Sequence, residues 1–295
     1  SNTYLSDDIG NLLKWKLPDI SFGSKKFLVF WCDKKNSTYH TNFRIKPETK
    51  AIYLSNSSAQ IIDSITLGPA FLNSSYGRFP DGATEWTHFI YGTPGKTNNG
   101  KTGTKQLGRV IFSSSGGFYG APLTLSLSAA DGKIYYTTDG SEPTESSIEY
   151  VAPITIDTTT VIRASAFEEG KIPGVPVTHT YFISLRSINL PVMSISTDSK
   201  YFFDNTIGIY VAGTNGITGM CSTNPVNWNQ DWERTINFEL YNKTKKMQLN
   251  QMTGVKINGN CSRTKAQKSL GIYSDEKYGK DELDYTFFSF KKIPK

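Results

Sequence analysis

Short segments that alternate apolar and polar positions recur along most of the chain, separated by turn-forming residues. The alternation is clearest at Ile61–Leu67, Leu123–Leu127 and Ile154–Ile156. Residues Lys133–Thr144 predict a strand of β-branched and aromatic residues that ends in a turn, because Asp139-Gly140 tolerates positive φ and proline cannot continue a ladder. Further strands are expected at Phe27–Cys32, Asn42–Ile45, Ala51–Ser55, Ser75–Arg78, Val161–Phe167, Ile236–Tyr241, Gly254–Gly259 and Gln267–Tyr273. Short strands at this spacing predict a mainly β fold built from sandwiches.

One stretch interrupts the strand pattern. Residues 96–105 consist largely of Gly, Asn, Thr and Lys and offer nothing to bury, which is typical of a linker. A length of 295 residues suggests about two domains, or three small ones. We therefore expect domains at residues 1–98, 108–184 and 185–295, with a linker at 99–107.

Composition and charge exclude several classes of protein. The chain holds 16 Tyr and 17 Phe, which indicates a folded protein. No segment approaches the roughly 18 to 20 apolar residues of a membrane-spanning helix. The net charge of +6 is spread along the chain, and the basic run Lys243–Lys246 is expected in a turn between strands, so we predict no nucleic-acid partner.

The cysteines and acidic residues give weak signals. Cys32 lies in an apolar run and is expected to be buried as a small hydrophobic residue. Cys221 and Cys261 share the C-terminal segment, but the sequence leaves open whether they pair. Asp33 and the Asp-Gly pairs sit one to a turn, without the dense spacing of a calcium loop, and the histidines are isolated. We predict no metal site.

The central segment resembles the C-terminal module of chitobiases and β-hexosaminidases. The resemblance spans Gly108–Ser184 and rests on Phe118-Tyr119, the run Tyr135–Thr144 and the strand Ile162–Phe167. In that family the module is an accessory domain, which implies a spacer or an ancillary binding role. Fold alone does not decide between these two roles.

The first segment resembles the lamin-tail domain, an immunoglobulin-like sandwich. The residues that carry the resemblance are Tyr4–Asp8, Trp15 with Leu17-Pro18, Ile61–Ile65, Ser75–Arg78 with Pro80–Gly82, and Thr93–Gly95. The opening strands usual in that family do not precede Tyr4. A sandwich without them would expose unpaired strand edges.

The third segment resembles the N-terminal part of the spore coat protein H (CotH) kinase-like family. The landmarks are Leu190–Val192, Gly208–Val211, Trp232–Arg234, Ile257–Arg263, Lys268–Leu270, Asp284-Tyr285 and Phe287-Phe288. This resemblance implies a partial, β-rich kinase-like lobe that uses ATP and magnesium. By kinase logic, Lys268 and Arg263 are the candidate contacts to nucleotide phosphates. An exposed strand lysine that faces solvent is the alternative interpretation of Lys268.

Together these features predict two tandem immunoglobulin-like sandwiches followed by a partial kinase-like lobe. We expect a non-catalytic modular fragment of a secreted or surface-attached bacterial protein, because no metal-binding acids of a larger kinase lobe are found before Lys295. Its expected role is that of a spacer or a binding module for a cell-surface protein or a glycan, without a cofactor. The alternative is the N-terminal portion of a CotH-like kinase that its accessory domains deliver to a target.

Overall fold

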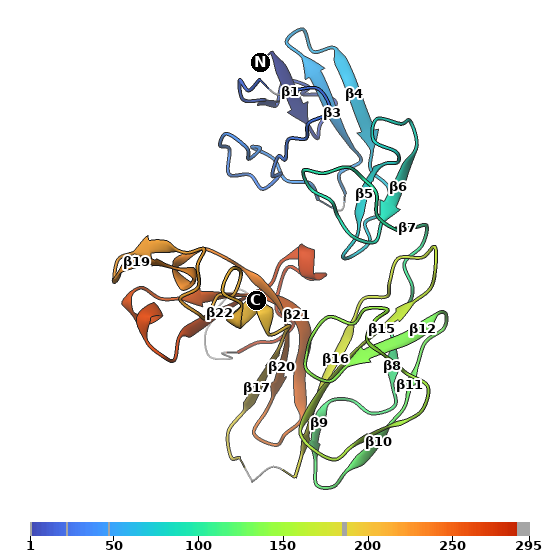
Figure 1. Cartoon of the computed structure of the whole chain (residues 1–295), viewed down its shortest axis with the longest axis vertical. Coiled ribbons are helices and arrows are strands. Elements are labelled where there is room, and N and C mark those ends of the chain that lie inside the picture. The colour runs from blue at the N-terminus through green and yellow to red at the C-terminus, as the bar shows by residue number, and fades with distance from the viewer. Residues whose placement is uncertain (1, 22, 47, 185–187, 288–295) are drawn as a thin grey trace. The chain divides into compact units, whose positions relative to one another are not determined.

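The computed structural model describes residues 2–21, 23–46, 48–184 and 188–287 of the chain. These form two compact units, Ser1–Gln106 with Gly170–Ile172, and Leu107–Glu169 with Pro173–Lys295. The structure is mainly β with very little helix, so the predicted fold class is confirmed at that level (Figure 1). The immunoglobulin-like tandem and the division into three domains stay predictions, and part of the third expected domain, residues 185–187 and 288–295, lies outside the described residues.

The first unit contains two antiparallel sheets. One has the strand order β2-β1-β3-β4 and the other β5-β6-β7. The strands are β1 (Thr3–Ser6), β2 (Trp15–Lys16), β3 (Ala51–Asn56), β4 (Ile61–Thr66), β5 (Ser75–Arg78), β6 (Trp86–Phe89) and β7 (Thr102–Gly103). Since β7 pairs with β6, part of the interval expected to be a linker is instead structured.

Two strands expected in the first unit are absent from the described residues. Phe27–Cys32 and Asn42–Ile45 lie in an irregular segment that holds only isolated bridges, Trp31 to His40 and Asp33 to Arg44. The predictions were wrong because the apolar residues of Phe27–Cys32 are exposed or half-buried and do not pair in a ladder; the ring of Phe30 instead meets that of Trp15 edge to face at 5.5 Å. Positive φ at Lys34 also breaks the extended backbone.

The second unit begins with the central module. Its five-stranded sheet has the order β13-β12-β15-β16-β9, accompanied by the pairs β10-β14 and β11-β8. The strands are β8 (Ile111–Phe112), β9 (Gly117–Tyr119), β10 (Leu123–Leu125), β11 (Leu127–Ser128), β12 (Lys133–Thr137), β13 (Ile148–Glu149), β14 (Ile154–Ile156), β15 (Thr160–Phe167) and β16 (Val177–Ile183). Alternate residues of these strands build one core, including the fully buried Leu125, Ile162 and Tyr181. The turn after β12 forms as predicted, with Gly140 at a φ of 83°.

A second sheet follows, with the antiparallel order β17-β20-β21-β22. Its strands are β17 (Val192–Ser196), β20 (Arg234–Tyr241), β21 (Met247–Asn258) and β22 (Ser269–Tyr273). Between β17 and β20 lie the helix α1 (Lys200–Phe203), the hairpin β18 (Ile217–Gly219) and β19 (Ser222–Val226), and the 3-10 turn η1 (Asn227–Asn229). Two more 3-10 turns, η2 (Cys261–Thr264) and η3 (Glu276–Tyr278), flank β22. The core of this part includes Ile209, Ile236 and Phe238.

A disulfide joins two loops of this second sheet. Cys221, next to the β18–β19 turn, pairs with Cys261 at the start of η2, and their Cα atoms are 5.1 Å apart. The pairing that the sequence left open is therefore formed. Cys32 is a free thiol and only half-buried, so it is less covered than expected.

A buried glutamate connects the five-stranded sheet of the module to the four-stranded sheet that follows it. Glu239 of β20 is fully buried, and both its carboxyl oxygens accept the backbone N–H of Thr180 in β16, at 3.2 and 3.1 Å. The hydroxyl of Tyr241 donates to the same group at 3.1 Å. A Cβ on Gly116 would lie 2.9 Å from Glu239 Oε1, so only glycine fits beside it. The module is thus bonded to the following sheet and does not hang free from it.

Candidate functional site

The two residues predicted to contact phosphates lie close together at η2. Lys268 is only 8% exposed, and its Nζ donates to the carbonyls of Arg263 at 2.8 Å and Lys265 at 2.9 Å. Nζ also lies 3.8 Å from the ring centroid of Trp228, and burial lowers the pKa of this amino group. Arg263 donates to the carbonyls of Gly259 at 2.6 Å and Trp228 at 3.0 Å.

The position of Lys268 disagrees with the interpretation of a strand lysine that faces solvent. Its cation instead closes the loop between β21 and β22 by binding backbone oxygens and an indole face. Whether Lys268 and Arg263 also contact phosphates stays a prediction.

A second charged group gathers around Glu233, which directly precedes β20. Its carboxylate lies 2.6 Å from Lys277 Nζ and 3.7 Å from Lys256 Nζ, and it accepts the hydroxyl of Tyr278. Burial of Glu233 raises its pKa, but the hydrogen bonds from Lys277 and Tyr278 outweigh that effect and leave the pKa below the ordinary value. This cluster connects β20 to η3 and β21.

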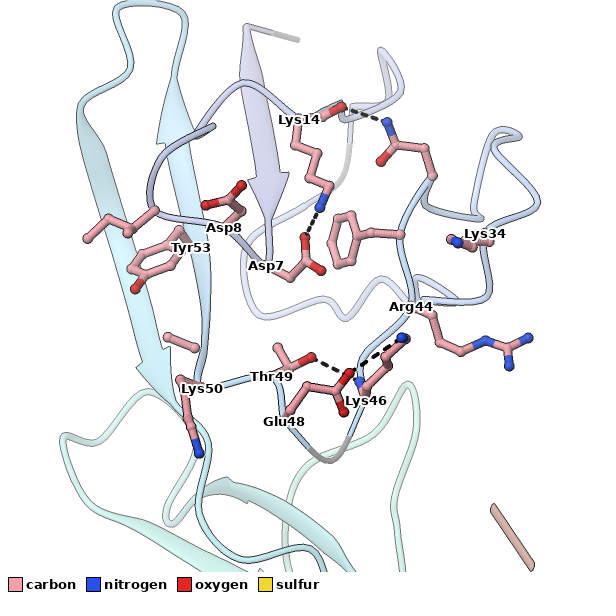
Figure 2. Close-up of a pocket in the computed structure, with 14 residues that line it drawn as sticks. Asp7, Asp8, Lys14, Lys34, Arg44, Lys46, Glu48, Thr49, Lys50 and Tyr53 are labelled. Atoms are coloured by element: carbon pink, nitrogen blue, oxygen red, sulfur yellow. Dashed lines mark hydrogen bonds and ion pairs between the residues drawn. The ribbon is translucent and has the colours of Figure 1, made fainter. Parts of the chain in front are cut away.

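The first unit contains a pocket of about 860 Å³ beside β1 and β3 (Figure 2). Four of its eight charged side chains form two ion pairs: Lys14 lies 2.5 Å from Asp7, and Lys46 lies 3.4 Å from Glu48. Figure 2 shows the guanidinium of Arg44 pointing out of the pocket. Among the residues that line the pocket, five are basic and three are acidic, so the lining carries an excess of positive charge.

Aromatic rings on the module, which could stack on a sugar, are covered. Among the described residues of 108–184, every aromatic side chain is buried or half-buried. Trp228 and Trp232 are also half-buried, and a cation covers one face of each. The exposed aromatic side chains lie elsewhere, and Trp31 of the first unit is one of them. The sequence pattern predicts a strand at Trp31 and therefore does not identify this side chain as exposed. The polar run that follows, Asp33–Thr38, is the signal in the sequence that could have indicated its exposure.

Two negative findings apply to the described parts of the chain. There, no three His, Cys, Asp or Glu side chains come close enough to hold a metal ion. No described helix has both the length and the apolar character needed to cross a membrane.

Comparison with known families gives one match. Residues 114–178 match the model of the chitobiase/beta-hexosaminidase C-terminal domain, within the segment where the resemblance was predicted. The central part of the prediction is therefore confirmed. Neither a search of curated proteins nor a search of solved structures returns a match to this chain. Domains of this type are carbohydrate-binding-like and occur in extracellular glycosidase-type proteins.

Proposed function

We propose that this chain is a non-catalytic, carbohydrate-binding part of a secreted or surface-attached bacterial protein. The observation that carries the proposal is the family match over residues 114–178, because that module type accompanies glycan-processing proteins and is itself accessory. Fold-level analogy of this kind raises the expectation of a function without assigning the residues that perform it.

Two structural features support the proposal. The disulfide between Cys221 and Cys261 suits an oxidising compartment outside the cytosol. The hydrogen bonds of Glu239 to Thr180 give the second unit a firm connection between its sheets, as a spacer that presents a binding surface requires. We expect the module to act as this support, since its described aromatic side chains are buried or half-buried.

A panel of immobilised glycans tests the proposal directly. The intact chain, carrying a fluorescent label, should be retained by at least one polysaccharide class and released by soluble fragments of the same polysaccharide. The same chain unfolded by reduction and heat is the control, because a folded site is needed for competition. Uniform absence of retention across plant, fungal and bacterial glycans would refute the proposal.

The second candidate function is that of a CotH-like kinase lobe delivered by a lamin-tail-like domain. What favours it is the position of Lys268 and Arg263 in one loop, where the Lys268 amino group reaches the Arg263 carbonyl. Calorimetric titration with ATP and magnesium tests it: saturable heat that Lys268→Ala abolishes supports the kinase-like interpretation. The neighbouring Lys265→Ala is the control, because that side chain is exposed. Absence of binding heat would leave the carbohydrate-binding proposal as the only one.

A further inference from the structure

Trp31 differs from the other four tryptophans in the chain. Trp15 is buried and meets Phe30 edge to face. A cation covers a ring face in the remaining three: Arg78 over Trp86, Lys268 over Trp228 and Arg234 over Trp232. Trp31, in contrast, is 56% exposed. An indole that keeps so much apolar surface in water lacks the burial that ordinarily stabilises this side chain.

The half-buried imidazole of His40 lies beside the exposed indole of Trp31. The rings of Trp31 and His40 lie 6.5 Å apart with planes 23° from parallel. The preceding residue, Phe30, packs inward on Trp15, and its ring stacks on that of Tyr39. The contact of Phe30 with the buried Trp15 therefore anchors the segment, whereas Tyr39 is itself 44% exposed. Their chain neighbours Trp31 and His40 form a small aromatic platform, which we call the Trp31–His40 platform.

The backbone fixes the Trp31–His40 platform in place. The N–H of Trp31 donates to the carbonyl of Tyr39 at 2.8 Å, and the N–H of Thr41 donates to the carbonyl of Trp31 at 2.9 Å. His40 Nδ1 lies 2.8 Å from Asp33 Oδ2, which sets the orientation of the imidazole. A ligand that stacks on these rings would therefore order few side chains on binding, which lowers the entropic cost.

The surroundings of the platform are polar. Asp33, Lys34, Lys35, Asn36, Ser37 and Thr38 form the turn that connects the two rings. Exposed apolar surface continues at Tyr39, which is 44% exposed, but the turn that connects the two rings offers only polar side chains. A sugar ring matches such surroundings, because it presents a flat face of C–H groups to an aromatic ring and hydroxyls at its rim. With Nδ1 held by Asp33, the Nε2 atom of His40 is the nitrogen that faces a ligand hydroxyl.

We infer that the Trp31–His40 platform binds a β-1,4-linked pyranose of an oligosaccharide, with the sugar ring stacked on the indole of Trp31. This inference rests on the proposed carbohydrate-binding function and assigns its site. Pyranoses whose substituents are equatorial have the flat face that an open indole needs. The platform is an exposed surface feature and not an enclosed cavity, so it suits an internal unit of a polymer.

Titration calorimetry of the intact chain with chitohexaose and cellohexaose tests the assignment. We expect one of the two to bind, and Trp31→Ala to weaken its affinity at least about tenfold. Trp31→Tyr should retain part of the affinity, because a smaller ring still stacks. His40→Ala should weaken binding less than Trp31→Ala, since imidazole supplies a hydrogen bond and only part of the stacking surface.

A matched control comes from the same unit. Tyr91 is 62% exposed and belongs neither to the platform nor to the residues that hydrogen-bond it, so Tyr91→Ala removes an exposed aromatic ring and leaves those contacts in place. Its affinity should equal that of the parent chain. If Trp31→Ala loses the folded circular dichroism spectrum, an NMR titration of the parent chain replaces the measurement on that variant. The indole N–H resonance of Trp31, assigned by its absence in Trp31→Tyr, should shift on titration with the hexasaccharide that binds.

The outcomes separate the inference from the proposed function. Glycan binding that Trp31→Ala leaves unchanged overturns the site and retains the function. Failure of both hexasaccharides to bind, when the glycan panel finds another ligand, also overturns the assignment to β-1,4-linked sugars. Failure across the panel refutes the function itself. Preferential binding of a single-stranded oligonucleotide, whose bases also stack on aromatic rings, would assign the platform to a different ligand class.

Discussion

Replacing Glu239 tests how firmly the central module is bonded to the sheet that follows it. Glu239→Ala removes the acceptor of the Thr180 N–H. Thr180 is buried, so the N–H has no access to solvent there. Tyr241 keeps a second acceptor, the Thr180 carbonyl at 3.5 Å, and Asn250 keeps the Thr178 carbonyl at 2.9 Å. The Thr180 N–H is therefore the group that loses its partner.

The loss of unfolding free energy follows from the Thr180 N–H that is left without an acceptor and from the cavity that the deleted side chain leaves. A buried N–H without an acceptor costs about 1–3 kcal/mol. The cavity left by the deleted side chain adds to this, for a total of about 2–5 kcal/mol. A unit of this size loses about 2–4 °C per kcal/mol, so the melting temperature should fall by about 4–20 °C. Glu239→Gln keeps the shape and one acceptor oxygen and should lose less than half as much.

Differential scanning calorimetry of the parent chain and its variants measures the effect on the transition of the second unit. Glu169→Ala is the control, because this carboxylate belongs to the same unit and is exposed. A loss within about 0.5 kcal/mol of the control, the usual range for surface substitutions, would show that Glu239 does not hold the sheets together.

Three further predictions concern the second unit. Replacing Cys221 and Cys261 by serine opens a loop of 40 residues and should lower the free energy of unfolding, measured in urea, by about 4 kcal/mol. Dithiothreitol should not destabilise this variant further. Equal stability with and without the disulfide would contradict the prediction. The hydrogen bond from Lys277 holds the folded pKa of Glu233 below 4.5, so its stabilisation is present above pH 4.5 and is lost as the pH falls through the folded pKa. Glu233→Gln should therefore flatten the pH dependence of stability on the acid side, and an unchanged slope would argue against the ion pair. Gly116→Ala should destabilise by about 1–3 kcal/mol in thermal unfolding, because its Cβ meets three atoms at 2.9 Å; parent-like melting would refute this steric argument.

The module could be predicted from the sequence because its signals are local. Alternation along Leu123–Leu125 and Ile154–Ile156 predicts two strands, each with its apolar side chains on one face, and both strands form; the structure pairs them with each other. The turn at Asp139-Gly140 needs positive φ at a residue that tolerates it, and Gly140 supplies it. Here residue chemistry, turn geometry and family resemblance agree on one structure.

The remaining features depend on contacts between distant parts of the chain. The run Phe27–Cys32 has the composition of a buried strand, and the contact of Phe30 with the distant Trp15, beside an exposed Trp31, does not follow from that composition. Glu239 alternates with the core residues of β20, so the local pattern places it on the solvent side; a strand 59 residues earlier in the chain buries it. The burial of Lys268 under Trp228 likewise arises from loop packing that no periodicity encodes.

Incubation of the intact chain with insoluble β-1,4-linked polysaccharide is the most direct test of the proposed function. The supernatant is measured for both free protein and released oligosaccharide. A non-catalytic carbohydrate-binding protein predicts saturable depletion of the chain from solution, reversed by the soluble hexasaccharide, with no sugar released over the polysaccharide blank. Protein that stays in solution with every polysaccharide tested, or release of oligosaccharide that depends on the chain, would contradict it.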